Sequence, residues 1–129
     1  MRILIPVMGN TMESRVPDYF GKALFYAVIE FDKEYNVRSI DFIKNPWFIG
    51  YRPGEYFAQY GIDYVVVREG CIVGIRARII FRSRGIGILI AKGDILREII
   101  ESIRRGMYKY YYMENTYVNK YVSWGRLYR

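Results

Sequence analysis

The chain has 129 residues, of which 52% are hydrophobic, which is enough for one domain with a sizeable core and too few for two. It contains one cysteine, Cys71, and no histidine, which excludes an intrachain disulfide, zinc sites built from Cys and His, and nucleophiles activated by an imidazole. The net charge of +7 is concentrated in residues 68–129, where thirteen Lys and Arg face five Asp and Glu. Such a basic half attracts anions: nucleic acid, an acidic protein or an anionic cofactor.

No apolar run approaches the roughly 20 residues that are needed to cross a bilayer, so we expect a soluble, cytoplasmic protein without a membrane partner. Abundant Ile, Tyr and Arg beside a single glutamine, Gln59, indicate a thermophilic source.

The first part of the chain predicts three strands. Residues 2–7 are a short, isoleucine-rich apolar run before the Gly9-Asn10 turn signal, which is typical of a central strand buried on both faces. Residues 25–31 alternate in a way that suits a second strand, and residues 36–43 predict a third. Because the connection between these two is short, we expect them to form an antiparallel hairpin.

The rest of the chain predicts alternating helices and strands: a helix over 53–60, a strand over 64–67, a helix over 71–83, a strand over 86–91, and a final helix from its cap Asp94 to 105. The order is therefore β-β-β-α-β-α-β-α. It predicts an α/β fold with three helices and a mixed five-stranded sheet that has one antiparallel edge.

Two segments carry a resemblance to a known family: residues 2–7, and residues 17–23 (PDYFGKA), which run directly into 24–31. With Gly61-Ile62-Asp63, Gly85-Ile86 and the closing amphipathic stretch, they are similar to the dinitrogenase iron-molybdenum cofactor biosynthesis family of NifX, NafY and the NifB C-terminal domain. The resemblance covers about residues 2–107. It implies a ribonuclease H-like motif and a non-enzymatic carrier of an anionic iron-sulfur or iron-molybdenum-sulfur cluster, with a cluster donor or acceptor protein as partner.

Residues 70–74 (GCIVG) lie where a predicted strand passes into a helix, so free backbone N–H groups and the helix dipole would face an anion and lower the pKa of the Cys71 thiol. The turn resembles the glycine-rich turn of the carrier family, although the Pro-Asn that commonly follows there is absent. The resemblance implies that Gly70, Cys71 and Gly74 hold the cluster, with Cys71 as the metal ligand. The alternative is a small buried thiol that packs a tight turn.

The long loop over 8–21 would lie at the same strand ends as residues 70–74, which is where open α/β sheets place ligands. We therefore expect both loops to form one mouth. Its further candidate cofactor-binding residues are Met8, Gly9, Asn10, Tyr19, Phe20 and Gly21. Tyr19 stands where family members often carry histidine, and because a phenol is a poor ligand for a soft metal, holding by charge is favoured over covalent attachment.

Residues 108–129 are predicted to be a tyrosine-rich, basic C-terminal extension of the carrier domain over 1–107. Aromatic faces for base stacking and cations for phosphate are the ingredients of single-stranded nucleic-acid binding. The alternative function is therefore a nucleic-acid-binding module that uses the basic second half and this extension. A strand or hairpin that packs on the domain, or on a second copy in a homodimer, is the other interpretation.

Overall fold

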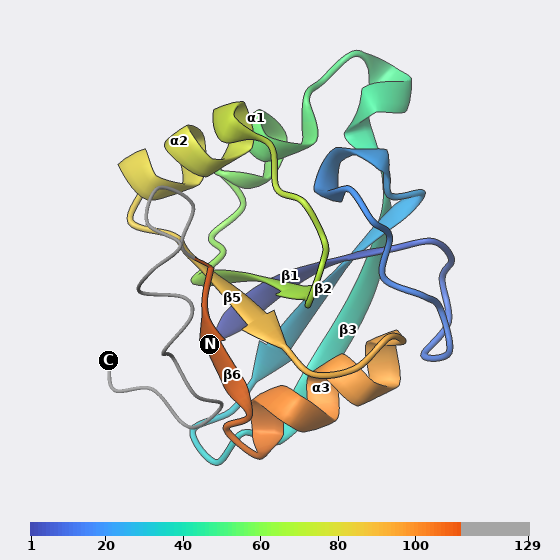
Figure 1. The fold of residues 1–129 in the computed structure, drawn as a ribbon, viewed down its shortest axis with the longest axis vertical. Helices are drawn as coiled ribbons and strands as arrows, with labels where there is room; N and C mark the ends of the chain where they lie inside the picture. The colour runs from blue at the N-terminus through green and yellow to red at the C-terminus, as the bar shows by residue number, and fades with distance from the viewer. Residues whose placement is uncertain (112–129) are drawn as a thin grey trace.

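The computed structural model of the protein describes residues 1–111 and shows one mixed sheet with helices on both of its faces (Figure 1). The strands are β1 (Arg2–Val7), β2 (Phe25–Phe31), β3 (Val37–Lys44), β4 (Tyr64–Arg68), β5 (Gly87–Ala91) and β6 (Tyr108–Tyr110). The helices are α1 (Pro53–Phe57), α2 (Ile75–Ser83) and α3 (Leu96–Arg104), and there are two 3-10 turns, η1 (Phe20–Lys22) and η2 (Pro46–Ile49). Helices α1 and α2 cover one face, and α3 covers the other (Figure 1).

The sheet has the order β3-β2-β1-β4-β5-β6. Strand β1 lies inside it, antiparallel to β2 and parallel to β4, and Ile3, Leu4 and Ile5 are fully buried, as the apolar run predicts. The β2–β3 pair is the expected antiparallel hairpin at the edge. The predicted α/β class with three helices and a mixed sheet is confirmed, whereas the ribonuclease H-like motif stays a prediction.

The predicted count of five strands is wrong, because the described sheet has six. The additional strand is β6, which pairs antiparallel with β5 from Leu89 to Ala91. Its residues, Tyr-Lys-Tyr, begin the predicted extension, and aromatic residues favour strands where they can pack on a half-buried surface. The division into a domain over 1–107 and an extension over 108–129 stays a prediction.

Residues 112–129 lie outside the described residues, and so do the nucleic-acid and homodimer interpretations that depend on them. Among residues 1–111, no helix is long and apolar enough to pass through a bilayer.

Three predicted helix boundaries change in the structure. Helix α1 ends at Phe57 instead of residue 60, α2 begins at Ile75 instead of residue 71, and α3 begins at Leu96. The expected cap of α3 by the Asp94 side chain is wrong. The Glu98 carboxylate instead accepts hydrogen bonds from the backbone N–H groups of Asp94 (2.9 Å) and Ile95 (3.3 Å), and these bonds hold the pKa of that carboxyl below its usual range.

Candidate functional site

The loop over 8–21 and the segment after β4 meet at the carboxyl ends of β1 and β4, as predicted. Tyr19 and Ile72 form a bridge between the two segments. The N–H of Ile72 donates to the carbonyl of Asp18 (2.7 Å), and the N–H of Phe20 donates to the carbonyl of Ile72 (2.9 Å). The two predicted segments are therefore adjacent, and main-chain hydrogen bonds fix them relative to each other.

The same loop is also attached to the connection between β5 and α3. The N–H of Val16 donates to the carbonyl of Asp94 (2.9 Å), and the N–H of Leu96 donates to the carbonyl of Ser14 (2.9 Å). Within the loop, the N–H of Met8 donates to the carbonyl of Arg15 (2.8 Å). A 14-residue connection would otherwise be costly to order, so these bonds prepare its shape before any ligand arrives.

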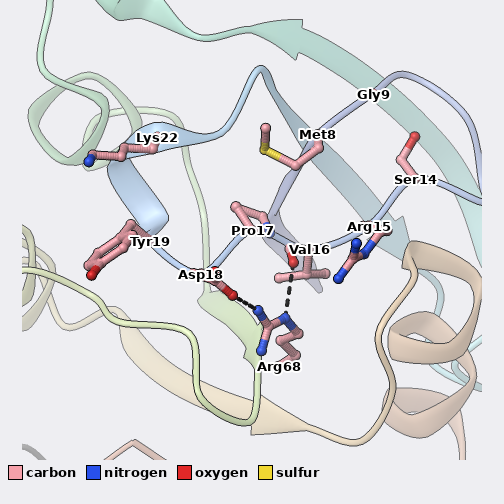
Figure 2. Close-up of a pocket in the computed structure, with 10 residues that line it drawn as sticks. All are labelled: Met8, Gly9, Ser14, Arg15, Val16, Pro17, Asp18, Tyr19, Lys22 and Arg68. Atoms are coloured by element: carbon pink, nitrogen blue, oxygen red, sulfur yellow. Dashed lines mark hydrogen bonds and ion pairs between the residues drawn. The ribbon is translucent and has the colours of Figure 1, made fainter.

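A pocket of about 540 Å³ lies between the loop and the end of β4 (Figure 2). Its volume is in the range of small-molecule and cofactor sites. The residues that line it are Met8, Gly9, Ser14, Arg15, Val16, Pro17, Asp18, Tyr19, Lys22 and Arg68. We call it the cationic pocket, because its lining contains three positively charged residues, Arg15, Lys22 and Arg68, and one carboxylate, Asp18.

Arg68 joins the end of β4 to the loop. Its Nε donates to the carbonyl of Val16 (3.0 Å), its Nη1 donates to the carbonyl of Glu69 (2.8 Å), and its Nη2 pairs with the Asp18 carboxylate. These contacts hold the guanidinium at one position, with 15% of the side chain exposed. Because Asp18 offsets this charge, the surplus positive charge of the pocket comes from Arg15 and Lys22.

Arg15 and Lys22 are exposed and lie on opposite sides of the cationic pocket (Figure 2). The Nζ of Lys22 is 5.0 Å from the centre of the Tyr19 ring, a cation–π contact that holds the ammonium beside the pocket. The pocket therefore has a cationic residue on each of two sides, and Met8 offers a thioether on its lining.

Cys71 lies beneath this surface with only 2% of its area exposed, and burial raises the pKa of its thiol to about 11. The nearby Arg68 guanidinium lowers that pKa, but by less than burial raises it. The expected lowering of the thiol pKa is therefore wrong, because α2 begins four residues later and does not present its N-terminus to Cys71. Residues 1–111 contain no group of three or more Cys, Asp or Glu that could hold a metal ion.

The structure distributes the nine predicted site residues over three places. The cationic pocket contains Met8, Gly9 and Tyr19. A neighbouring apolar groove is lined by Phe20, Gly21 and Gly74, and also by Tyr19. Neither the pocket nor the groove is lined by Asn10, Gly70 or Cys71.

Sequence reasoning missed the two cations that carry the surplus charge, Arg15 and Lys22. A signal was present, because both lie within or directly beside the loop that was predicted to form the mouth. The family resemblance instead indicated Gly70, Cys71 and Gly74 as the residues that hold the cluster.

No known protein-family model matches the chain, and no curated protein sequence matches it either. Solved structures do. The apo form of the orange protein from Desulfovibrio gigas is 18% identical, with a TM-score of 0.65 over 85% of this chain and 92% of that one. A Thermotoga protein of the DUF35 family, provisionally named NifB, is 19% identical, with a TM-score of 0.66 over 88% and 98%. The chain shares their fold.

A Methanocaldococcus jannaschii protein that is provisionally named a dinitrogenase shares it as well, at 14% identity and a TM-score of 0.66 over 86% of this chain and 94% of that one. Two of these three names refer to nitrogenase or to NifB. The predicted resemblance to nitrogenase-associated proteins is therefore supported at the level of the fold.

Proposed function

We propose that the protein is a non-enzymatic carrier of an anionic metal-sulfur cluster, which the cationic pocket holds as cargo. The observation that carries the proposal is that Arg15, Lys22 and Arg68 all line one pocket of about 540 Å³ at the carboxyl ends of β1 and β4. The fold shared with proteins named for NifB and dinitrogenase supports the choice of a metal-sulfur cluster among the possible anions.

Charge and hydrogen bonding hold the cargo in this proposal. Arg15 and Lys22 neutralise the cluster from opposite sides, and Arg68 stays fixed by its bonds to the loop. The Tyr19 hydroxyl can donate to a sulfide, and the exposed Met8 thioether offers a soft contact. The Cys71 thiol takes no part, because it is buried and a pKa of about 11 keeps it protonated at neutral pH.

Holding by exposed cations suits a carrier, which must release its cargo to another protein. An exposed ion pair contributes at most about 1 kcal/mol in water, and salt weakens it. Several such contacts retain a multiply charged cluster during transfer, yet no metal–thiolate bond has to break when an acceptor takes it.

The test is an anaerobic titration with tetrathiomolybdate and, separately, with a synthetic iron-sulfur cluster, followed by visible absorption and metal analysis. We expect one-to-one binding by the wild type. The double variant Arg15→Gln/Lys22→Gln should bind about thirtyfold more weakly, since it loses two charge contacts of about 1 kcal/mol each. Arg38→Gln, which removes an exposed cation on β3 away from the pocket, is the matched control and should bind like the wild type.

Three results would contradict the proposal. Absence of uptake of either compound by the wild type would remove the carrier function. Equal binding by the double variant would remove the cationic pocket as its site. Loss of uptake in a folded Cys71→Ala variant would mean that the Cys71 thiol binds the cluster.

A further inference from the structure

An apolar groove of about 280 Å³ lies beside the cationic pocket, between η1, α1 and α2. The two sites share Tyr19 and Lys22, so these two residues lie where the sites meet. The groove is lined by Tyr19, Phe20, Gly21, Lys22, Arg52, Pro53, Gly54, Glu55, Ile72, Gly74, Arg76, Ala77 and Ile80. Ile72 is 49% exposed there, although it is fixed by the bridge to Tyr19.

The turn η2 presents three consecutive large apolar side chains to solvent. Trp47, Phe48 and Ile49 are 65%, 61% and 69% exposed. Tyr51, which follows after Gly50, is also exposed. Single exposed apolar residues are ordinary in a soluble protein, but a contiguous group of this size typically marks an interaction surface.

Hydrogen bonds from the buried side chain of Asn45 hold this turn in place. The Asn45 side chain, which is 5% exposed, accepts from the N–H of Trp47 (2.9 Å) and donates to the carbonyls of Gly21 (3.2 Å) and Ala23 (2.7 Å). Gly50 closes the turn in the left-handed region, with φ +89°, which favours glycine. The apolar side chains of η2 are therefore held outward on a fixed backbone, a pre-organised arrangement that suits binding.

The turn and the apolar groove belong to one surface. The chain passes from η2 through Arg52 directly into the groove wall, α1 contacts η2, and all these elements lie at the same end of the molecule (Figure 1). The surface thus combines a protruding apolar tip with a recessed apolar groove. A bilayer accommodates protruding side chains but does not fill a recess, whereas a protein segment fits both.

Charge around this surface selects an acidic partner. Lys22, Arg52 and Arg76 border the groove against a single carboxylate, Glu55. Beside the tip, the Nζ of Lys44 lies 5.3 Å from the centre of the Phe48 ring. Positive groups that surround an apolar centre favour a partner with carboxylates around its own apolar side chains, since complementary charge speeds encounter and disfavours wrong partners.

We infer that the η2 tip and the apolar groove form a docking face for an acidic, amphipathic segment of a second protein. Its apolar side chains enter the groove and contact Trp47, while its carboxylates pair with Lys22, Arg52 and Arg76. The inference rests on the proposed function only for the partner's role: a segment that contacts Tyr19 and Lys22 reaches the rim of the cationic pocket, where a cluster donor or acceptor has to act.

The experiment selects random-sequence peptides displayed on phage against the full chain without any cluster. We expect the enriched peptides to carry Leu, Ile or Phe at helical spacing with Asp and Glu between them. Synthetic copies are then titrated in a Trp124→Phe background, which leaves Trp47 as the only tryptophan, and burial of Trp47 should shift its emission to shorter wavelength. Trp47→Ser, read by calorimetry, and Ile72→Ser should each weaken binding about tenfold, as truncation of a central anchor does.

Val37→Ser is the matched control, because it removes a similarly exposed apolar side chain from β3, and it should bind like the wild type. Failure to enrich peptides, or enrichment of basic peptides whose binding survives Trp47→Ser, would overturn the inference. If the Trp47 emission shifted with phosphatidylglycerol vesicles but not with peptides, the docking face would bind a membrane surface instead of a protein segment. If the protein formed a dimer that Trp47→Ser abolished, the docking face would bind a second copy of this chain. Since no cluster is present, these failures leave the carrier proposal standing.

Discussion

The cationic pocket and the apolar groove share the segment from Tyr19 to Lys22, yet they are built in different ways. The pocket is formed by a loop that main-chain hydrogen bonds attach to residue 72 and to the start of α3, and its side chains stay largely in solvent. The groove is formed by short helices whose opposite sides fill the core. One anchored turn can therefore support two sites of opposite chemistry.

This arrangement has a chemical consequence. A hydrated anion needs cations that keep their water until it binds, whereas an apolar segment needs a surface that releases water. Tyr19 meets both needs, because one face of its ring lies by Lys22 and the side chain also lines the groove. Cargo and partner can therefore be bound next to each other, with Tyr19 and Lys22 as the residues that both sites use.

The largest expected effect comes from the anchor that both regions share, Phe20. It is 1% exposed, its ring centre lies 5.1 Å from that of Tyr26 and 5.6 Å from that of Phe81, and its carbonyl accepts a bond from the Tyr26 hydroxyl (2.6 Å). Phe20→Ala should lower the free energy of unfolding by about 3–5 kcal/mol, measured by urea denaturation. Tyr19→Ala, one position earlier and 47% exposed, should cost below about 1 kcal/mol. Equal losses would mean that η1 is not anchored through Phe20.

The next effect distinguishes the cationic pocket from the apolar groove by loosening η2, the turn beside the groove. Asn45→Ala leaves the N–H of Trp47 and the carbonyls of Gly21 and Ala23 without their partner, and we expect a loss of about 2–3 kcal/mol in thermal unfolding. Peptide binding should weaken with it, while tetrathiomolybdate binding stays within about twofold, a change below 0.5 kcal/mol. Asn10→Ala, at an exposed position, is the control. A larger loss of anion binding than of peptide binding would contradict the separation.

The strands and the mouth could be predicted because their signals are local. Apolar periodicity defines residues 2–7 and 25–31 almost to the residue, and the rule that ligands bind at the carboxyl ends of parallel strands places the loop over 8–21 opposite residues 70–74. Strand β6 was missed from the sheet, because whether a short aromatic segment pairs with β5 depends on tertiary contacts that no periodicity reports.

The environment of Cys71 could not be predicted for the same reason. The bridge between Tyr19 and Ile72 keeps the segment after residue 70 extended, which delays the start of α2 and turns the thiol toward the core. A glycine-rich turn before apolar, helix-periodic residues gives no sign of such a bridge. The sequence thus brought the two segments together correctly but gave the thiol of Cys71 an exposure and a pKa that the structure does not have.

The buried thiol gives a third prediction, in which stability depends on pH. Burial raises the pKa of Cys71 from 9.0 to about 11, so the folded state retains a proton that the unfolded state releases. The resulting stability is fully present below pH 9 and is lost as the pH rises toward 11, by on the order of 2 kcal/mol in urea denaturation. Burial raises the pKa of Tyr26 too, so a loss that begins at higher pH should remain in Cys71→Ala. A thiol on the surface of the pocket would show no such dependence.

The smallest effect tests Tyr19, which lines both sites. Tyr19→Leu keeps an apolar wall for the groove but removes the aromatic face over which the Lys22 ammonium lies at 5.0 Å. A cation–π contact at an exposed position contributes about 0.5–1 kcal/mol, so tetrathiomolybdate should bind about two- to fivefold more weakly while the selected peptides bind as before. Ile72→Ser should do the reverse, because it changes the groove without touching a cation of the pocket. If both variants weakened both ligands equally, the pocket and the groove would be a single site, and a partner could reach this surface only after the cargo had left.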